Sequence, residues 1–471
     1  RRGRRGDGTS IGDVVGEATS FFSYCWVGTK LRDMLDAIEK ILAALEADGK
    51  RRYVWIDILC ASQNLLQGVI KDPAMSSAEV GIEDAISTVG ELLFYMEPLA
   101  GEWAAPPHPF LLAEHGEPAA GWVRSGPAAL TRAWCIFELA KALAKGCSLH
   151  VLLSPASVAL FERRMTEPYF DFEDGLGGFE WVAKLLGGID VKRAQISFVK
   201  DREYIVGEVA KLEGGMGAIN SNVMGALRGW LTTEAKALLE TMPEEERGTS
   251  VLINNVSAML EDGGRLAEAE VLYREILAAE RAKGGERAPD TLGALGNLAG
   301  NLLNQRKHAE AEPLFREVLA AEREANGDDD EDTQISVGLL GRVLQEQGKL
   351  DEAEPLCVEA AAWFRANKGP QYVHTVSFVP DLVELRRRQG RLAEAEQELG
   401  SLVADARAGL GPQHQETLKV EAIAARLQHA QPGGAAAGAA ELRAVVERMG
   451  EFLGAAHQYT VKWQRVLEGM T

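Results

Sequence analysis

GRLAEAEVLYREIL, residues 264–277, is the first of four similar segments in the second half of the chain. It returns as RKHAEAEPLFREVL (306–319), GKLDEAEPLCVEAA (348–361) and GRLAEAEQELGSLV (390–403), which places an Ala-Glu pair every 42 residues. A threonine keeps the same step at Thr249, Thr291, Thr333, Thr375 and Thr417. Two markers in phase over several steps indicate stacked units of supersecondary structure, because each unit is too small to bury its apolar face alone.

Each unit is predicted to be a pair of helices joined by a turn that contains glycine. Apolar residues at helical spacing mark the first helix, as at Leu252, Val256 and Leu260. In the second helix the small Ala269 lies among larger apolar residues, which lets neighbouring helices approach closely. Residues 249–471 are therefore predicted to form an all-α solenoid of about five units with a concave face.

The array resembles the tetratricopeptide repeats of kinesin light chains. That family has Asn-Asn-Leu-Ala in the first helix, Glu-Ala-Glu in the second and a Leu-Gly-x-x-His-x-x-Thr linker. The matching stretches here are LINNVSAML (252–260), LGNLAGNLL (295–303), LGPQHQET (410–417) and LGAAHQYT (453–460). The resemblance implies a groove that binds a partner peptide, and it implies that the linker histidines are structural.

In kinesin light chains, asparagines facing the groove hold the backbone of the bound peptide. The resemblance places peptide-binding side chains at Asn255, Asn297 and Asp381, which share one repeat position with Leu339. The asparagine ladder is thus present in two units and replaced in two. The alternative interpretation is that these asparagines only satisfy local backbone groups.

Composition limits the classes of function. A length of 471 residues allows two or three domains, and a net charge of −20 argues against binding nucleic acid or an anionic membrane. Five cysteines lie in apolar segments without a pairing pattern, which favours reduced thiols and a cytoplasmic setting. No run of about 18 apolar residues occurs, so no membrane-spanning segment is expected.

The first half of the chain alternates between predicted strands and helices. Strands are expected at 20–26, 53–59, 91–97 and 148–154, helices at 31–50, 77–90 and 130–146, and a fifth strand-helix unit at 194–212. This alternation predicts an α/β domain over 18–212 with a parallel sheet, helices on both faces and an insertion at 98–128. Residues 1–17 are expected to be a disordered end, and 213–248 a helical connector. Phosphate-binding glycine loops are absent, which argues against dinucleotide or ATP binding by those devices.

YVWIDIL (53–59) and WCIFELAKALAKGCSLHVLLS (134–154) resemble the flavodoxin-like fold of Toll/interleukin-receptor (TIR) domains. In that family a Trp-Cys-x-x-Glu-Leu helix precedes the fourth strand, and many members cleave the glycosidic bond of NAD. The resemblance implies that Glu138 is the catalytic carboxylate, that Trp134 and Trp26 contact the substrate, and that the domain self-associates. One alternative interpretation places Glu138 on the helix surface beside Lys141 and Arg132, and another leaves the domain only an assembly role.

Three functions follow as hypotheses. The first is a scaffold or signalling adaptor that binds a partner peptide through its repeats and needs no cofactor. The second is a TIR-type NAD glycohydrolase that uses Glu138 and is regulated by the repeats, with NAD as substrate. The third is a cargo adaptor of the kinesin-light-chain type. No metal site is expected, since His108 and His115 lack further ligands at a suitable spacing.

Overall fold

The computed structural model describes residues 20–23, 54–56, 91–96, 102–104, 123–125, 133–153, 155–172, 174–187, 189, 199–209, 211, 215–453 and 457–470. The chain divides into two compact units, Arg1–Trp230 and Leu231–Thr471. The predicted helices at 31–50 and 77–90, together with Trp26, His108 and His115, lie outside the described residues.

Among the residues that the structure describes, the first unit contains a parallel sheet of four strands. Its order is β2 (Val54–Ile56), β1 (Ser20–Ser23), β3 (Glu91–Tyr95) and β6 (Ser148–Leu152). Each strand falls within a segment that the sequence predicted to be a strand. Numbered by strand alone, this is the order 2-1-3-4 with which a flavodoxin-like sheet begins. Helix α6 (Ala133–Ala144) contacts β1 and β3.

Several elements of the first unit had no counterpart in the sequence prediction. The insertion contains an antiparallel pair, β4 (Glu102–Ala104) and β5 (Val123–Ser125). After β6 come α7 (Pro155–Thr166), the short η5 (Tyr169–Asp171) and α8 (Gly178–Gly187). The predicted strand at 194–199 lies outside the described residues except for Val199, which begins α9 (Val199–Val209).

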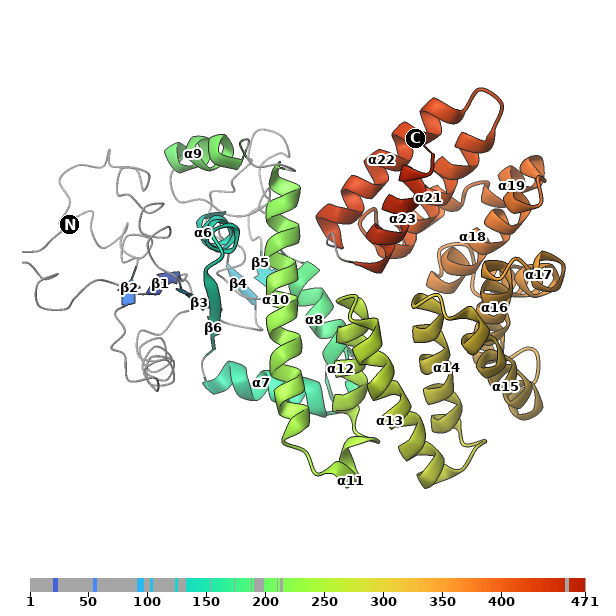
Figure 1. Ribbon diagram of the computed structural model, residues 1–471, viewed down its shortest axis with the longest axis horizontal. Helices are drawn as coiled ribbons and strands as arrows, with labels where there is room; N and C mark the ends of the chain where they lie inside the picture. The colour runs from blue at the N-terminus through green and yellow to red at the C-terminus, as the bar shows by residue number, and fades with distance from the viewer. Residues whose placement is uncertain are drawn as a thin grey trace, which may run out of the picture. The chain divides into compact units, whose positions relative to one another are not determined.

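The second unit is a stack of helix pairs, as predicted. Helix α10 (Gly215–Glu240) spans the boundary between the two units and is followed by the short α11 (Glu244–Arg247). The first helices of the pairs are α12 (Val251–Asp262), α14 (Pro289–Asn304), α16 (Glu331–Glu346), α18 (Val373–Arg388) and α21 (Gln415–Ala430). The second helices are α13 (Leu266–Gly284), α15 (His308–Asn326), α17 (Leu350–Asn367), the divided α19 (Leu392–Leu399) and α20 (Leu402–Gly409), and α22 (Ala435–Phe452). A final single helix, α23 (Gln458–Glu468), begins a sixth unit (Figure 1).

The Ala-Glu pairs join each helix pair to the next. The alanines have no exposed surface, which lets the helices pack closely, and they are Ala269, Ala311, Ala353 and Ala395. The glutamate beside each alanine accepts hydrogen bonds from the following unit. Glu270 accepts from Gln305 Nε2 at 2.8 Å and from Lys307 Nζ at 2.6 Å. Glu312 and Glu354 repeat this contact with Lys349 at 2.7 Å and with Arg391 at 2.8 Å.

The threonine marker fixes the linkers that lead into the first helices. Thr291 Oγ1 donates to Gly285 O at 2.8 Å, and Thr375 Oγ1 donates to Gly369 O at the same distance. Both threonines are buried, so each hydrogen bond replaces water at a linker carbonyl. The two sequence markers therefore have separate physical roles, one within the linker and one between units.

The side of the solenoid that carries the first helices is called the inner face. Helices α14, α16, α18, α21 and α23 contact one another in succession. In the described part of the chain, no contact of comparable extent joins the second helices α13, α15 and α17 to each other. Helices closer together lie on the smaller radius of a curved stack, so the first helices line the concave side.

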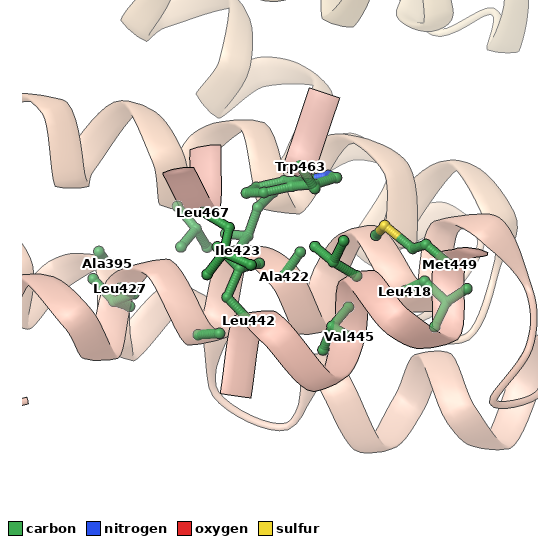
Figure 2. Close-up of a cluster of buried hydrophobic side chains, with 13 residues drawn as sticks. Ala395, Leu418, Ala422, Ile423, Leu427, Leu442, Val445, Met449, Trp463 and Leu467 are labelled. Carbon is green, nitrogen blue, oxygen red and sulfur yellow. The ribbon is translucent and has the colours of Figure 1, made fainter. Parts of the chain in front are cut away.

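Buried side chains hold the last helices of the solenoid together. Trp463 and Leu467 of α23 pack with Leu442 and Met449 of α22 in one apolar cluster (Figure 2). Burial of large apolar side chains contributes about 1.5–3 kcal/mol each, so these contacts fix α23 on the fifth pair. Among the described residues, no helix is long and apolar enough to cross a membrane. Cys357 of α17 is a buried free thiol.

Candidate partner-binding face

The four positions of the predicted asparagine ladder have different surroundings. Asn255 is buried with 8% of its surface exposed, whereas Asn297 is exposed and Leu339 is partly exposed. Asp381 is buried, and its Oδ2 accepts a hydrogen bond from Arg342 Nε at 2.7 Å. Lys419 Nζ lies 3.6 Å from the other oxygen of Asp381. Of these side chains, Asn297 is the one most accessible to a partner, whereas Asp381 already pairs with cations of the chain itself.

Glycines leave the backbone of α14 open around Asn297. A Cβ atom placed at Gly293, Gly296 or Gly300 would have no atom within 4 Å apart from the nearby backbone of its own helix and its chain neighbours. Glycine inside a helix costs about 1 kcal/mol relative to alanine, and packing does not explain its use at these three positions. At Gly338 and Gly341 of α16, by contrast, Phe378 and Cys357 fill the space. Helix α14 therefore offers bare backbone beside one exposed amide.

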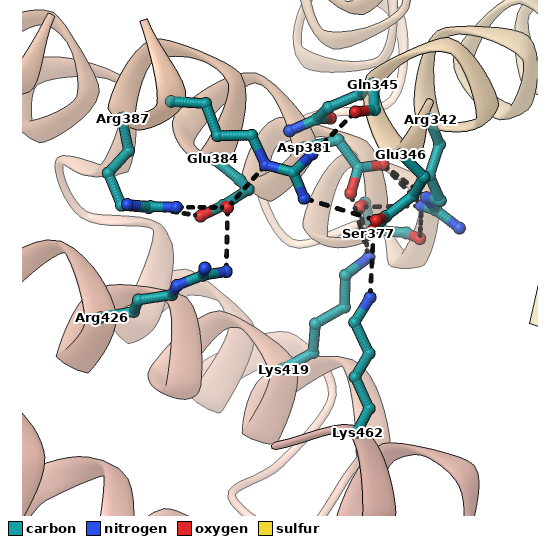
Figure 3. A network of polar contacts seen from close by, with 11 residues as sticks. Arg342, Gln345, Glu346, Ser377, Asp381, Glu384, Arg387, Lys419, Arg426 and Lys462 are labelled. Atoms are coloured by element: carbon teal, nitrogen blue, oxygen red, sulfur yellow. Dashed lines mark hydrogen bonds and ion pairs between the residues drawn. The ribbon is translucent and has the colours of Figure 1, made fainter. Parts of the chain in front are cut away.

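An arginine cluster lies farther along the inner face, on α18 and α21. Glu384 accepts from Arg387 Nε at 2.8 Å and from Arg426 Nη1 at 2.9 Å (Figure 3). It also accepts from Arg388 Nε at 3.0 Å. Burial opposes ionisation of Glu384, but the bonds from Arg387 and the charge of Arg426 keep the pKa of this carboxyl below its usual value. Three guanidinium groups thus share one carboxylate. The arginine cluster is defined as Arg387, Arg388 and Arg426.

The cluster has remaining capacity for an anion. Burial lowers the pKa of Arg426, and the positive charges of Arg387 and Arg388 lower it further despite the opposing effect of Glu384. The Arg426 side chain keeps 28% of its surface exposed. Since a guanidinium has five N–H donors, one bond to Glu384 leaves others for a carboxylate or phosphate.

A second polar network, beside the cluster, links α16, α18, α21 and α23. Arg342 bonds to Asp381, and Lys419 donates to Ser377 O at 2.8 Å. Glu416 accepts from the Tyr459 hydroxyl at 2.9 Å, and burial followed by the charge of Glu416 raises the pKa of Tyr459 well above its usual value. Figure 3 shows Lys419 and Lys462 pointing from α21 and α23 toward this network.

The structure describes the side chain of Glu138, the predicted catalytic residue of the first unit. Glu138 has no exposed surface, so the interpretation of Glu138 as a surface residue is wrong. Lys141, one turn further along α6, pairs with Glu208 of α9 at 3.1 Å. Trp134 belongs to α6, and Trp26 lies outside the described residues. Catalysis by Glu138 remains a prediction. Among the described residues, no group of three or more His, Cys, Asp or Glu could hold a metal ion.

The sequence prediction missed the arginine cluster, although the run Arg386-Arg387-Arg388 was visible in the sequence. Its meaning depends on the 42-residue repeat. Arg342, Glu384 and Arg426 occupy one repeat position, at which the first two pairs have Ala258 and Gly300. An alignment of the units by the threonine marker would have shown that this position carries a charged residue from the third pair onward.

The tetratricopeptide repeat family matches residues 290–356, which include most of α14 and the following helices as far as α17. The second unit contains tetratricopeptide repeats. No curated protein matches the chain.

Three solved structures similar to this chain share low sequence identity with it. The first is a putative kinesin light chain from Podosopora anserina with nearly identical TPR-like repeats. It has 20% identity and a TM-score of 0.34, and the match covers 42% of this chain and 94% of that chain. The second is BtubC (BKLC) from P. vanneervenii, with 18% identity, a TM-score of 0.33, and coverage of 52% and 91%. The third is a Rap protein complexed with Competence and Sporulation Factor, with 15% identity, a TM-score of 0.36, and coverage of 73% and 99%. Likeness at this level assigns no function to the chain.

Proposed function

We propose that the chain is a protein-interaction scaffold or signalling adaptor whose repeats bind an acidic, extended segment of a partner protein on the inner face. The observation that carries the proposal is the arginine cluster. The chain has a net charge of −20, yet its inner face places three arginines around Glu384, with Glu346, 3.4 Å from Arg388, as a second carboxylate beside them. An anionic partner would neutralise this local excess of positive charge, so the excess favours the complex over the free chain.

The partner segment is expected to make two kinds of contact. Carboxylates of the partner pair with free donors of Arg426 and Arg387. The partner backbone lies against α14, where Gly293, Gly296 and Gly300 permit close approach and Asn297 offers an amide to backbone groups. The arginine cluster attracts acidic side chains at one end of the segment. At the other end α14 contacts the partner backbone, so many partner sequences are tolerated there.

We also propose that the first unit is a TIR-like module. The support is the parallel order β2-β1-β3-β6 together with α6 directly before β6, as the resemblance implied. The module would then act by assembly. NAD cleavage is not favoured by the described geometry, because a carboxylate with no exposed surface cannot reach the ribose of a bound nucleotide without rearrangement. No feature of the described residues favours the cargo-adaptor hypothesis over the scaffold proposal.

A peptide-display selection against the full chain tests the scaffold proposal. The expected result is enrichment of peptides rich in Asp and Glu. An Arg387→Gln/Arg426→Gln variant should lose that enrichment. The matched control is Arg274→Gln/Arg316→Gln, which removes two arginines of second helices that bond to Glu270 and Glu312. Failure to enrich acidic peptides, or equal loss in both variants, would contradict the proposal. Thermal unfolding followed by circular dichroism checks that each variant is folded.

A further inference from the structure

The last helix of the solenoid touches units far from it in sequence. His457 Nε2 lies 3.4 Å from Asp262 Oδ1 at the end of α12. Lys462 Nζ lies 3.5 Å from Glu346 Oε1 at the end of α16. Helix α23 belongs to the sixth unit, so these two contacts reach the first and the third unit across the inner face.

The geometry of His457 assigns its proton. Nδ1 accepts a hydrogen bond from the Tyr459 backbone N–H at 3.2 Å and so caps the start of α23. A neutral imidazole with an accepting Nδ1 carries its hydrogen on Nε2. Nε2 is the atom that faces Asp262, so it can donate toward that carboxylate. His457 is buried, with 2% of its surface exposed, which shields this contact from water.

Helix α23 is held in two ways that differ in strength. Trp463 and Leu467 fix it to the fifth pair through the apolar cluster of Figure 2. Its contacts to Asp262 and Glu346 are long polar contacts, and the Lys462 side chain is 57% exposed. The Lys462–Glu346 pair contributes little because Lys462 is exposed, and the His457–Asp262 contact, although buried at His457, is a single polar contact of 3.4 Å, longer than an ordinary hydrogen bond. Each unit of a solenoid is bound mainly by its neighbours. The connection from α23 to the first and third units is therefore the part that can open while α23 stays folded.

We propose that the contacts His457–Asp262 and Lys462–Glu346 form a latch that closes the solenoid from its last helix onto its first and third units. The closed latch narrows the inner face, and the open latch widens it. The idea that a partner enters through this opening rests on the proposed function. The latch itself is a property of the chain alone.

A distance measurement on the full chain, without any partner, tests the latch. Nitroxide labels on p-acetylphenylalanine at Val271 of α13 and at Gln464 of α23, both exposed, report the separation of the first and last units by pulsed electron paramagnetic resonance. The latch variant is His457→Asn/Lys462→Ala, because asparagine still caps a helix but cannot reach Asp262. The control is Arg287→Ala/Glu352→Ala, which breaks exposed ion pairs between adjacent units.

The expected result is one narrow distance distribution in the wild type and in the control. The latch variant should show a second, longer distance, with the ratio of open to closed molecules raised about 2- to 30-fold by the loss of two weak contacts. Identical distributions in the wild type and the latch variant would overturn the proposal, as would a broad distribution already present in the wild type. Because no partner is present, failure of the peptide selection leaves this test unaffected.

Discussion

At the scale of single residues, Arg306 shows how strictly the repeat fixes the backbone. The turn between the two helices of a pair has glycine with φ of 75° at Gly264, 80° at Gly348 and 77° at Gly390. In the second pair the same position is Arg306, with φ of 64°. A residue with a Cβ atom is strained there by roughly 1–2 kcal/mol. The neighbouring helices hold the turn in place against this strain.

Replacing Arg306 with glycine should therefore stabilise the chain. We expect Arg306→Gly to raise the free energy of unfolding of the repeats by about 0.5–1 kcal/mol, as measured by urea titration. The mirror variant, Gly348→Arg, should lower it by a similar amount. If both variants unfold at the wild-type urea concentration, the turn does not carry the strain that its φ angle implies.

The glutamates of the Ala-Glu pairs make stability depend on acid. Contacts from the next unit lower the pKa of Glu270, Glu312 and Glu354 to about 2, chiefly through hydrogen bonds from Lys307, Lys349 and Gln389 respectively. In the unfolded chain a glutamate titrates near a pKa of about 4.3. Because the folded pKa is the lower one, this stability is present above about pH 4.3 and is lost as pH falls toward 2.

A glutamine variant at these positions should reduce the acid sensitivity. Glu270→Gln/Glu312→Gln should lose about 0.2–1 kcal/mol per site at pH 7 and less at pH 3, since the sites are partly exposed. Glu396→Gln is the control, because Glu396 accepts from Gln431 at 2.7 Å while Gly433 replaces the cation found in the other units. The measurement is the free energy of unfolding, obtained by chemical unfolding at several pH values. If it changes with pH equally in the wild type and the double variant, these inter-unit hydrogen bonds do not cause the acid sensitivity.

At the scale of elements, a histidine cap makes α21 sensitive to pH. His414 Nδ1 accepts the Glu416 backbone N–H at 3.2 Å, and burial lowers the pKa of His414 despite the opposing charge of Glu416. An unfolded histidine titrates near a pKa of about 6.5. As pH falls through that value the unfolded chain takes up the proton first, so the folded state loses stability.

His414→Asn should remove this loss because asparagine caps the helix at any pH. We expect the free energy of unfolding of the wild type to fall more than that of His414→Asn between pH 7.5 and 5.5. The measurement is chemical unfolding at several pH values. Equal slopes for the two proteins would show that protonation of His414 does not affect the cap. The side chain of His414 caps α21, which agrees with the prediction that this linker histidine is structural.

The elements differ in how well the sequence predicted them. The 42-residue repeat period and the turn glycines were enough to predict the helix pairs, because every unit repeats the same local sequence pattern. The break between α19 and α20 was missed, although Gly400 has φ of 38° and interrupts the helix there. Helices α7 and α8 were missed because they follow no repeat. Each of these helices buries an aromatic side chain, Phe161 in α7 and Trp181 in α8, but no repeated pattern in the sequence marks either segment.

The candidate site was harder to predict than the fold because it depends on which charges meet across units. The sequence places Asp381 in the asparagine ladder, yet the structure pairs it with Arg342, 39 residues earlier. Arg388 likewise reaches Gln345 O, 43 residues away, at 2.7 Å. Separations of 39 and 43 residues are close to the 42-residue period, so these contacts join neighbouring units, but the period alone does not determine which side chains meet.

At the scale of the whole molecule, the proposed function depends on the second unit acting as a curved stack with a charged inner face. The inter-unit hydrogen bonds hold neighbouring pairs, and the proposed latch holds the last helix to distant ones. Opening and partner binding would then be coupled, because a partner that favours the open form must shift the population of the closed form. The net charge of −20 disfavours nonspecific association of the chain with acidic partners.

The most direct test of the inner face is the affinity of the full chain for the best acidic peptide from the selection, measured by isothermal titration calorimetry. We predict that Arg387→Gln/Arg426→Gln raises Kd at least about tenfold, since charge-assisted hydrogen bonds contribute roughly 1.5–3 kcal/mol each. The control Arg274→Gln/Arg316→Gln should leave Kd within about twofold of the wild type. A Kd that is unchanged in the first variant, or raised equally in both, would contradict binding at the arginine cluster of the inner face.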